Sequence, residues 1–448
     1  MYFKRKIYNK LKEWKNDSNG QTALLVEGAR RIGKSTIVEE FAKNEYDSYI
    51  LIDFSNASEN VLKLFDDISN LNYFFSMLQL LNHVDLIERK SLIIFDEVQL
   101  FPRARQAIKH LVKDGRYDYI ETGSLISIKK NVEKILIPSE ERSINMHPMD
   151  FEEFLWAIGQ ESTYKLLKEV YNTGSKIADG VHRELIKTFR LYMLIGGMPQ
   201  AVDTYLKTNN FQKVDSIKRD IIKLYEEDLA KIDNSGKLKT LFNAIPAQLN
   251  KNTKGFQLNK VLNSYKIEEE KKFTLLSELI ESKIINIAYL TNNPDIDLNA
   301  YINLDKYKIY LLDTGLFVTL QFRDKDFSQN TIYEKLLTDS LSVNLGYLYE
   351  NAVAQALVAN ETELIYYVFE NKTQKRNYEI DFLISKGNKI CPIEVKSSNY
   401  RKHESIDKFY EKYSNRIANR YIIHTKAPSK DKDIICLPIY LASFLTIK

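Results

Sequence analysis

Hydrophobic and polar positions in the first part of the chain predict a layered fold. Continuous apolar runs that end in polar residues are typical of parallel strands buried on both faces. After the first run, Ile37, Val38 and Phe41 recur at helical spacing, so a strand is followed by a helix. The repeated runs predict an α/β domain with a parallel sheet. The predicted strands are residues 22–26, 49–54, 91–97 and 118–124.

The hydrophobic pattern changes three times beyond this first domain. Long helical periodicity with few helix breakers predicts a helical lid over residues 160–235. Three apparent helices followed by a hairpin, a pattern typical of a winged-helix module, occupy residues 236–315. A helix and then alternating strands, one of them at residues 377–384, predict a smaller α/β domain over residues 316–448. A core at residues 1–159 completes the predicted domain order.

Composition places the chain among ordinary folded proteins. Of its 448 residues, 44% are apolar and 28% are charged, and the formal net charge is +4. This weakly basic balance permits nucleic-acid contact without arguing for it. The two cysteines, Cys391 and Cys436, form no C-x-x-C pair, which excludes a zinc site of that kind and fits a reducing compartment. Because no apolar run is long enough to span a membrane and the N-terminus is charged, we expect a cytoplasmic protein without membrane contact.

The first candidate site lies between the first predicted strand and the helix after it. Residues 28–35 fit the phosphate-binding pattern G-x-x-x-x-G-K-[ST]. The two glycines allow the backbone to direct its N–H groups toward one point, and the helix dipole adds positive potential there. Lys34 is expected to reach the β- and γ-phosphates of ATP, and Ser35 to bind Mg²⁺. The predicted nucleotide-binding residues are Gly28, Ala29, Arg30, Arg31, Ile32, Gly33, Lys34, Ser35, Thr36, Asp96 and Ser124.

A second candidate site lies at the end of the third apolar run. Four apolar residues followed by Asp96 and Glu97 form a Walker B pattern. Asp96 is expected to hold Mg²⁺, and Glu97 to orient and deprotonate the attacking water. Gln99 either faces the nucleotide or is a solvated loop residue. Thr122 and Ser124, at the tip of the next strand, either contact the γ-phosphate or the water, or form a plain Gly-Ser turn.

The succession of these motifs is similar to that of a known family. The phosphate loop, Phe95-Asp96-Glu97-Val98-Gln99, Thr122-Gly123-Ser124, Arg142, residues 148–155 and Gly196-Gly197-Met198-Pro199 resemble the AAA-family ATPases of bacteria and archaea that carry a C-terminal DUF4143 region. The resemblance implies ATPase activity with ATP and Mg²⁺ as cofactors. It also implies that Arg142 is an arginine finger, which stabilises charge on the transferring phosphoryl group in cis or in trans. Family members usually have Gly-Arg where this chain has Glu141-Arg142.

Three features leave more than one interpretation open. The glycines of residues 196–199 interrupt a helical pattern, either for close backbone approach, such as to the adenine, or as a plain helix break. Arg30 and Arg31 either face a phosphate or a neighbouring subunit, or lie on the surface. The winged-helix pattern either places its third helix in the major groove of DNA or packs against the ATPase core. DNA, a protein partner and a second copy of the chain are therefore all candidate partners.

The last candidate site is spread over the C-terminal region and resembles the PD-(D/E)xK nuclease core, which DUF4143 regions commonly preserve. It takes Glu350 from a helix, Asp381 from a strand, and Glu394 and Lys396 from the next strand. Because Glu394 and Lys396 are two residues apart, they share one face of that strand. Asp381 and Glu394 are predicted to bind Mg²⁺, Lys396 to stabilise the hydroxide or the phosphorane charge, and Glu350 to hold a second ion or a water.

These patterns support two functional hypotheses. The first is an ATP-binding and ATP-hydrolysing protein that acts on or near DNA and has a Mg²⁺-dependent, nuclease-like C-terminal domain. The alternative is a nucleotide-dependent signalling or assembly switch whose C-terminal nuclease fold is inactive and binds a partner. No helicase motif set is recognisable.

Both hypotheses share one predicted architecture: an AAA-type P-loop NTPase core with a parallel sheet, a helical lid, a winged-helix module and a restriction-endonuclease-like α/β domain. The predicted catalytic residues are Lys34, Glu97, Arg142, Asp381, Glu394 and Lys396. The predicted metal ligands are Ser35, Asp96, Glu350, Asp381 and Glu394.

Overall fold

A computed structural model describes most of the chain, namely residues 2–125, 138–250, 255–263, 268–324, 331–338, 346–371, 377–397 and 401–446. The chain forms two compact units. Unit 1 comprises Met1–His147 and Leu276–Ile284, and unit 2 comprises Pro148–Leu275 and Ile285–Lys448. Within the described residues, no helix is both long and apolar enough to cross a membrane.

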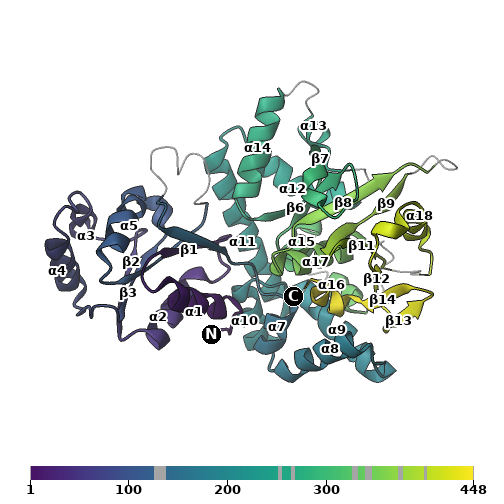
Figure 1. Ribbon diagram of the computed structural model, residues 1–448, viewed down its shortest axis with the longest axis horizontal. Coiled ribbons are helices and arrows are strands. Elements are labelled where there is room, and N and C mark those ends of the chain that lie inside the picture. The colour runs from purple at the N-terminus through teal and green to yellow at the C-terminus, as the bar shows by residue number, and fades with distance from the viewer. Residues whose placement is uncertain are drawn as a thin grey trace. The chain divides into compact units, whose positions relative to one another are not determined.

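Unit 1 is built on a parallel sheet with the strand order β2-β3-β4-β1-β5, which confirms the predicted α/β class (Figure 1). All four predicted strands are present, and β1 runs through a loop into α2 as the phosphate-binding motif requires. The elements are α1 (Ile7–Ser18), β1 (Ala23–Glu27), α2 (Lys34–Glu45), β2 (Ser48–Asp53), α3 (Glu59–Leu64), α4 (Leu71–Asn82), β3 (Ser91–Asp96), η1 (Val98–Leu100), α5 (Pro102–Asp114), β4 (Asp118–Gly123) and β5 (Glu141–Asn145).

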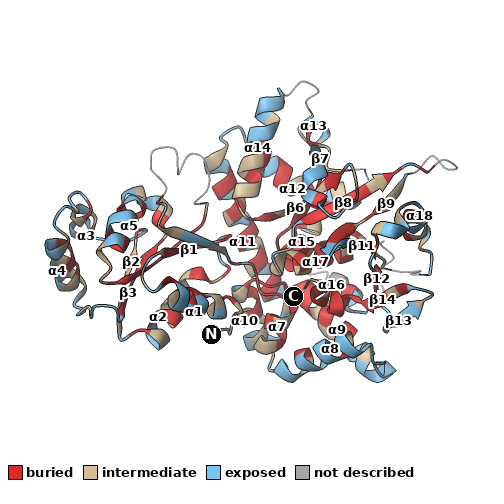
Figure 2. Cartoon of the chain, in the orientation of Figure 1, coloured by how far each residue is buried: buried red, intermediate tan, exposed pale blue. Residues whose placement is uncertain are grey.

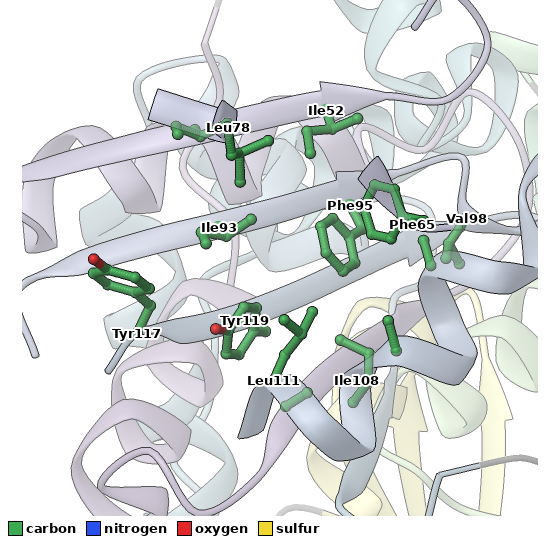
Figure 3. Close-up of a cluster of buried hydrophobic side chains, with 14 of the residues drawn as sticks. Ile52, Phe65, Leu78, Ile93, Phe95, Val98, Ile108, Leu111, Tyr117 and Tyr119 are labelled. Carbon is green, nitrogen blue, oxygen red and sulfur yellow. The ribbon is translucent and has the colours of Figure 1, made fainter. Parts of the chain in front are cut away.

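Alternate side chains of the sheet in unit 1 enter one hydrophobic cluster with α3, α4 and α5. Ile93 and Phe95 of β3 point into it, where Leu78 of α4 and Leu111 of α5 also lie (Figure 3). Every residue of β3 is buried, including those between these two, because the strand is covered on both faces. Burial on both faces therefore explains the continuous apolar run that identified this strand in the sequence.

Unit 2 begins with helices, as the periodicity of residues 160–235 predicts. The exposed residues gather on the outer helices, for example α8 and α18, whereas the strands carry mainly buried residues (Figure 2). Its helices are α7 (Phe151–Ala157), α8 (Glu161–Thr173), α9 (Asp179–Ile195), α10 (Pro199–Thr208), α11 (Phe211–Ile232), α12 (Lys237–Asn250), α13 (Leu258–Val261), α14 (Glu269–Glu281, whose last residues belong to unit 1), α15 (Thr314–Gln321), α16 (Thr331–Leu337), α17 (Gly346–Ala359), α18 (Glu404–Tyr413), and the short helices η2 (Leu298–Tyr301), η3 (Ser414–Arg416) and η4 (Ile439–Leu445).

The strands of unit 2 form sheets with the orders β7-β6-β8-β9 and β10-β11-β12-β14-β13. The predicted hairpin is present as the antiparallel pair β6 and β7, but β6 also pairs in parallel with β8. The hairpin of the predicted winged-helix module thus shares a sheet with the predicted C-terminal domain, and the domain limits stay predictions. The strands are β6 (Ile285–Thr291), β7 (Ile302–Leu311), β8 (Leu364–Phe369), β9 (Tyr378–Ile380), β10 (Phe382–Lys386), β11 (Lys389–Val395), β12 (Arg420–His424), β13 (Ser429–Asp431) and β14 (Ile434–Pro438).

The prediction of one strand over residues 377–384 is wrong, because the chain changes sheets within it. β9 pairs with β8, whereas β10 pairs with β11 of the other sheet. Asp381 is the residue between the two strands. A period-two pattern continues through such a junction, so the sequence alone does not reveal it. The junction places Asp381 where the two sheets meet.

Gly196 and Gly197 serve a close backbone approach within unit 2. A Cβ on Gly197 would clash with the backbone of Met149, and one on Gly196 would clash with the carboxylate of Asp313. Gly197 donates its N–H to Asp313 at 2.5 Å, and Met149 donates its N–H to the Gly197 carbonyl at 2.7 Å. The glycines therefore join three segments of the chain itself, which accounts for them without a ligand.

Candidate functional site

The phosphate loop of unit 1 has the backbone geometry that its glycines predict. Gly28 has a φ of 150° and Gly33 a φ of 95°, both in the region that favours glycine. A Cβ at Gly28 would overlap the carbonyl oxygen of Met146 on the chain segment after β5. Gly33 caps α2, and Ile37 donates its N–H to the Gly33 carbonyl at 3.1 Å. The loop thus ends at a helix N-terminus, where backbone N–H groups and the helix dipole favour an anion.

Lys34 is buried inside this loop. Its ammonium donates to the carbonyl oxygens of Gly28 at 2.9 Å and Ala29 at 2.8 Å. Burial lowers the pKa of Lys34 to about 8, although the nearby carboxylates of Glu97 and Asp96 act in the opposite direction. A phosphate group would supply the negative charge that this ammonium lacks in its carbonyl cradle.

Asp96 lies at the point where three strand ends meet. One of its carboxylate oxygens accepts hydrogen bonds from the Ser35 hydroxyl, at 2.8 Å, and from the Thr122 hydroxyl. Ser35 begins α2 after β1, Asp96 ends β3, and Thr122 lies near the end of β4, so the carboxyl edge of the sheet brings them together. A carboxylate beside a hydroxyl is the oxygen donor set that holds Mg²⁺ next to phosphates. The structure therefore brings the predicted Ser35 and Asp96 into direct contact.

Glu97 is held in an uncommon backbone conformation beside this site. Its φ of 54° and ψ of 43° are left-handed, which is rare for a residue other than glycine. Val98, which follows Glu97, and Phe95, two residues before it, are both fully buried in the same cluster (Figure 3). The Gln99 amide donates a hydrogen bond to the Glu97 carboxylate. Gln99 therefore contacts the predicted base, a contact that neither interpretation of the sequence included.

Arg5 is a residue that the sequence motifs did not single out. It is buried, and its guanidinium donates to the carbonyl oxygens of Ile32 in the phosphate loop, at 2.8 Å, and of His147, at 2.6 Å. It thereby ties the N-terminal segment to the loop. The only sequence signal was an arginine beside the apolar residues of the first helix, which is too common to be specific.

Arg142 lies far from the loop of its own subunit. It is exposed on β5, where it pairs with Leu24 of β1, four residues before Gly28. Four residues of strand span about 13 Å, which exceeds the reach of an arginine side chain. This position does not favour action in cis, and the arginine-finger role stays a prediction. Its neighbour Glu141, where the family usually has glycine, forms a buried bidentate ion pair with Arg105 at 2.8 and 3.0 Å.

The other predicted loop residues differ in exposure. Ala29 and Ile32 are buried, Arg30 is partly buried, and Arg31 and Thr36 are exposed. Ser124 is buried directly after β4, close in sequence to Thr122. Their contacts with a nucleotide stay predictions.

In unit 2 the structure gathers three carboxylates, and one of them was not predicted. Glu350 of α17, Glu379 of β9 and Asp381 each place a carboxylate oxygen within 4.8 Å of the others. Glu379 was missed, although its spacing of two residues from Asp381 on an extended segment places both on one face. Lys308 of β7, also missed, forms ion pairs with Glu350 at 2.7 Å and with Glu379.

The predicted pairing of Asp381 with Glu394 is replaced by separate contacts. Asp381 accepts the Val395 N–H at 2.7 Å, and Glu394 forms an ion pair with Lys396 at 2.5 Å. Burial raises the pKa of Glu394, and that of Asp381 is raised well above its usual value by burial and by Glu350. Asp381 still feels the charges of Glu394 and Lys396, so the four residues form one electrostatic group. The side chains predicted for this site are therefore neighbours, with Glu379 in the carboxylate group in place of Glu394.

Family comparisons match three segments of the chain. Residues 20–155 match the family described as AAA domain. Residues 186–326 and 345–442 match two domains of unknown function, DUF8612 and DUF4143. The chain therefore carries an AAA domain near its N-terminus and a DUF4143 domain near its C-terminus, which confirms the predicted resemblance. No curated protein matches the sequence.

Several solved structures are similar to parts of the chain at low sequence identity. The Walker-type ATPase PABY2304 of Pyrococcus abyssi is 16% identical, with 71% of this chain and 96% of that one covered and a TM-score of 0.43. The ORC1 protein of Aeropyrum pernix, solved in complex with DNA, is 10% identical, with coverages of 71% and 92% and a TM-score of 0.30. The RuvB branch migration motor of Thermotoga maritima is 12% identical, with coverages of 63% and 89% and a TM-score of 0.28.

Proposed function

We propose that this chain, which carries an AAA domain followed by a DUF4143 domain, binds ATP with Mg²⁺ in unit 1 and hydrolyses it. The observation that supports this most strongly is the convergence of Lys34, Ser35, Asp96 and Thr122 at the carboxyl edge of one parallel sheet. These residues come from the ends of two strands, β3 and β4, and from the start of α2. The Lys34 ammonium is buried and donates to two carbonyl oxygens, a position from which it can contact a bound phosphate.

Each residue of the site has a distinct part in the proposed reaction. Backbone N–H groups between Gly28 and Ser35 bind the phosphates, and Lys34 exchanges its carbonyl contacts for phosphate oxygens. Ser35 and Asp96 would hold Mg²⁺, which neutralises charge on the β- and γ-phosphates when bound. Glu97 accepts the proton of the attacking water. If Arg142 acts as an arginine finger, it must act at the phosphate loop of a neighbouring copy, because the phosphate loop of its own chain is out of its reach.

Phosphate release from ATP tests this proposal. Lys34→Ala should abolish Mg²⁺-dependent hydrolysis, whereas the matched variant Lys43→Ala, at an exposed position on the same helix, should hydrolyse ATP like the wild type. Equal turnover of the wild type and Lys34→Ala would overturn the assignment. Sedimentation with and without ATP would measure the oligomeric state, because Arg142 can act in trans only if the chain forms oligomers.

A second proposal concerns DNA and the C-terminal cluster. We propose that unit 2 acts on DNA through a Mg²⁺-dependent phosphodiester cleavage site made by Glu350, Glu379, Asp381, Glu394 and Lys396. The specific observation is that carboxylates from a helix, a strand and the residue that follows this strand converge, and that Asp381 among them is influenced by the charge of Glu394, which is paired with Lys396. Such a set can bind a divalent cation, and Lys396 can stabilise the charge that develops on a phosphodiester. Docking of α14 in a DNA groove, as in a winged helix, belongs to the same proposal.

Nicking of supercoiled plasmid DNA tests the second proposal. Asp381→Ala and Lys396→Ala should each lose Mg²⁺-dependent nicking. Lys389→Ala, at an exposed lysine that begins β11, the strand directly before Lys396, should retain it. Equal nicking by all variants would eliminate the nuclease assignment. Absence of nicking with intact ATP hydrolysis would favour the alternative, a nucleotide-dependent switch in the cytoplasm whose C-terminal fold binds a partner.

A further inference from the structure

Lys308 is the centre of the carboxylate group in unit 2. It lies on β7, outside the segments that carry the predicted nuclease residues, and its side chain is 9% exposed. Its ammonium contacts Glu350 and Glu379 at once, and Tyr310, two residues further along β7, donates its hydroxyl to the same Glu350 oxygen at 2.5 Å. A cation therefore already occupies the position between the carboxylates.

Lys308 offsets part of the negative charge of this group. Burial alone would lower the pKa of Lys308, but Glu350, Glu379, Tyr310 and Asp381 together raise it well above its usual value, so the ammonium stays charged. The ammonium of Lys308 lies against Glu350 and Glu379 and offsets part of the negative charge of the three carboxylates, which weakens the attraction of the group for a divalent cation.

We propose that Lys308 is a resident cation that closes the acidic site of unit 2 to divalent metal, and that metal binds only when this ammonium is displaced. The inference rests on the proposed C-terminal site and adds its regulation. Two carboxylate oxygens bound to one Ca²⁺-sized ion lie up to about 5 Å apart, so oxygens within 4.8 Å of one another suit such an ion once Lys308 leaves. A metal ion and the ammonium cannot both occupy the space beside Glu350.

A second observation indicates that the site is reached from solvent. A pocket of about 20 Å³, bounded by Gln248, Gly255 and Phe256, opens on Lys308 and Glu350 and is large enough to admit a water molecule. The Glu394 carboxylate is buried, and within the described residues its Oε2 atom has no hydrogen-bond partner.

Tyrosine-sensitised terbium luminescence tests this proposal on the full-length chain without nucleotide. Tb³⁺ resembles Ca²⁺ in size and oxygen preference, and Tyr310 adjoins Glu350, so an ion bound there is excited through the tyrosine. Lys308→Met should raise the apparent Tb³⁺ affinity about a hundredfold, because one positive charge beside the ion is removed. Lys306→Met is the matched control, since Lys306 is an exposed lysine on the same strand, and its affinity should match the wild type.

A double variant separates this effect from a general loss of structure. Lys308→Met with Glu379→Gln removes one carboxylate as well, and the gained affinity should be lost again while the unfolding midpoint stays near that of Lys308→Met. Unchanged affinity in a folded Lys308→Met would overturn the proposal, as would tight Tb³⁺ binding by the wild type that Glu379→Gln abolishes. Raised metal affinity without plasmid nicking would support the role of Lys308 and refute nuclease activity, so the two proposals fail separately.

Discussion

Replacing Lys34 with methionine should separate the function of the phosphate loop from its stability. The lysine pKa is about 8 in the folded chain, against 10.5 for the free side chain, mainly because of burial. A shift of that size corresponds to about 3 kcal/mol of unfavourable free energy for holding the charged form. Methionine has a similar length and carries no charge, so this free-energy cost is absent in Lys34→Met. ATP hydrolysis should be absent in this variant as well.

The pH dependence of this effect has a definite sign. Because the folded pKa is lowered, the unfolded chain binds more protons between pH 8 and 10.5, and the stability of the wild type rises with pH in that window. Lys34→Met lacks this rise. The free energy of unfolding of the variant, relative to the wild type, should therefore fall by about 3 kcal/mol between pH 7 and pH 10.5. Lys34→Met also loses the hydrogen bonds from Lys34 to Gly28 and Ala29. This loss lowers the stability of the variant relative to the wild type by the same amount at every pH below 8.

Urea unfolding in the absence of nucleotide measures this difference. The chain has two tryptophans, and Trp14 is buried on α1 of unit 1. In a Trp156→Phe background, Trp14 fluorescence therefore reports unit 1 alone. Lys113→Met, at an exposed lysine on α5, serves as the control and should show no such pH dependence. A stability difference between Lys34→Met and the wild type that is constant from pH 7 to pH 10.5 would refute the reasoning.

Three further outcomes follow from the geometry of unit 1. Glu97→Gln keeps the shape of the site but removes the proposed base, so ATP should still bind while turnover falls at least about a hundredfold, as single-turnover phosphate release would show. Gln99→Leu removes the amide that contacts Glu97 and should lower kcat about tenfold with little change in the KM for ATP. The same substitution at an exposed glutamine, Gln106→Leu, is the control and should behave as the wild type. Arg105→Leu leaves the buried Glu141 and Glu121 without the cation of Arg105. It should destabilise unit 1 by about 3–5 kcal/mol in urea unfolding. An unfolding midpoint equal to that of the wild type would contradict this.

The phosphate loop was predictable because its geometry is local. Gly28 and Gly33 adopt positive φ values within a few residues of Lys34, and the apolar runs on either side determine the strand and the helix. The partnership of Asp96 with Ser35 was also predictable, since residues at the carboxyl ends of parallel strands meet at one edge. The role of Gln99 was ambiguous, because its contact with Glu97 depends on a left-handed backbone conformation at Glu97 that the residue types do not predict.

Segments distant in the chain decided what the sequence did not reveal. Arg5, just before α1, donates to the phosphate loop, and Glu141, where the family usually has glycine, pairs with Arg105 of α5.

By itself the sequence determined the α/β core, the phosphate loop and the acidic strand end, because each depends on a few consecutive residues and a periodic pattern. Only the tertiary structure decided which charges meet in unit 2. Lys308 and Glu350 lie more than forty residues apart and become neighbours through the packing of α17 against β7, while the change of sheet at Asp381 brings Glu379 into the group. Electrostatic interactions depend on distance in space and not on separation along the chain, so the cation of this site was visible only in the folded molecule.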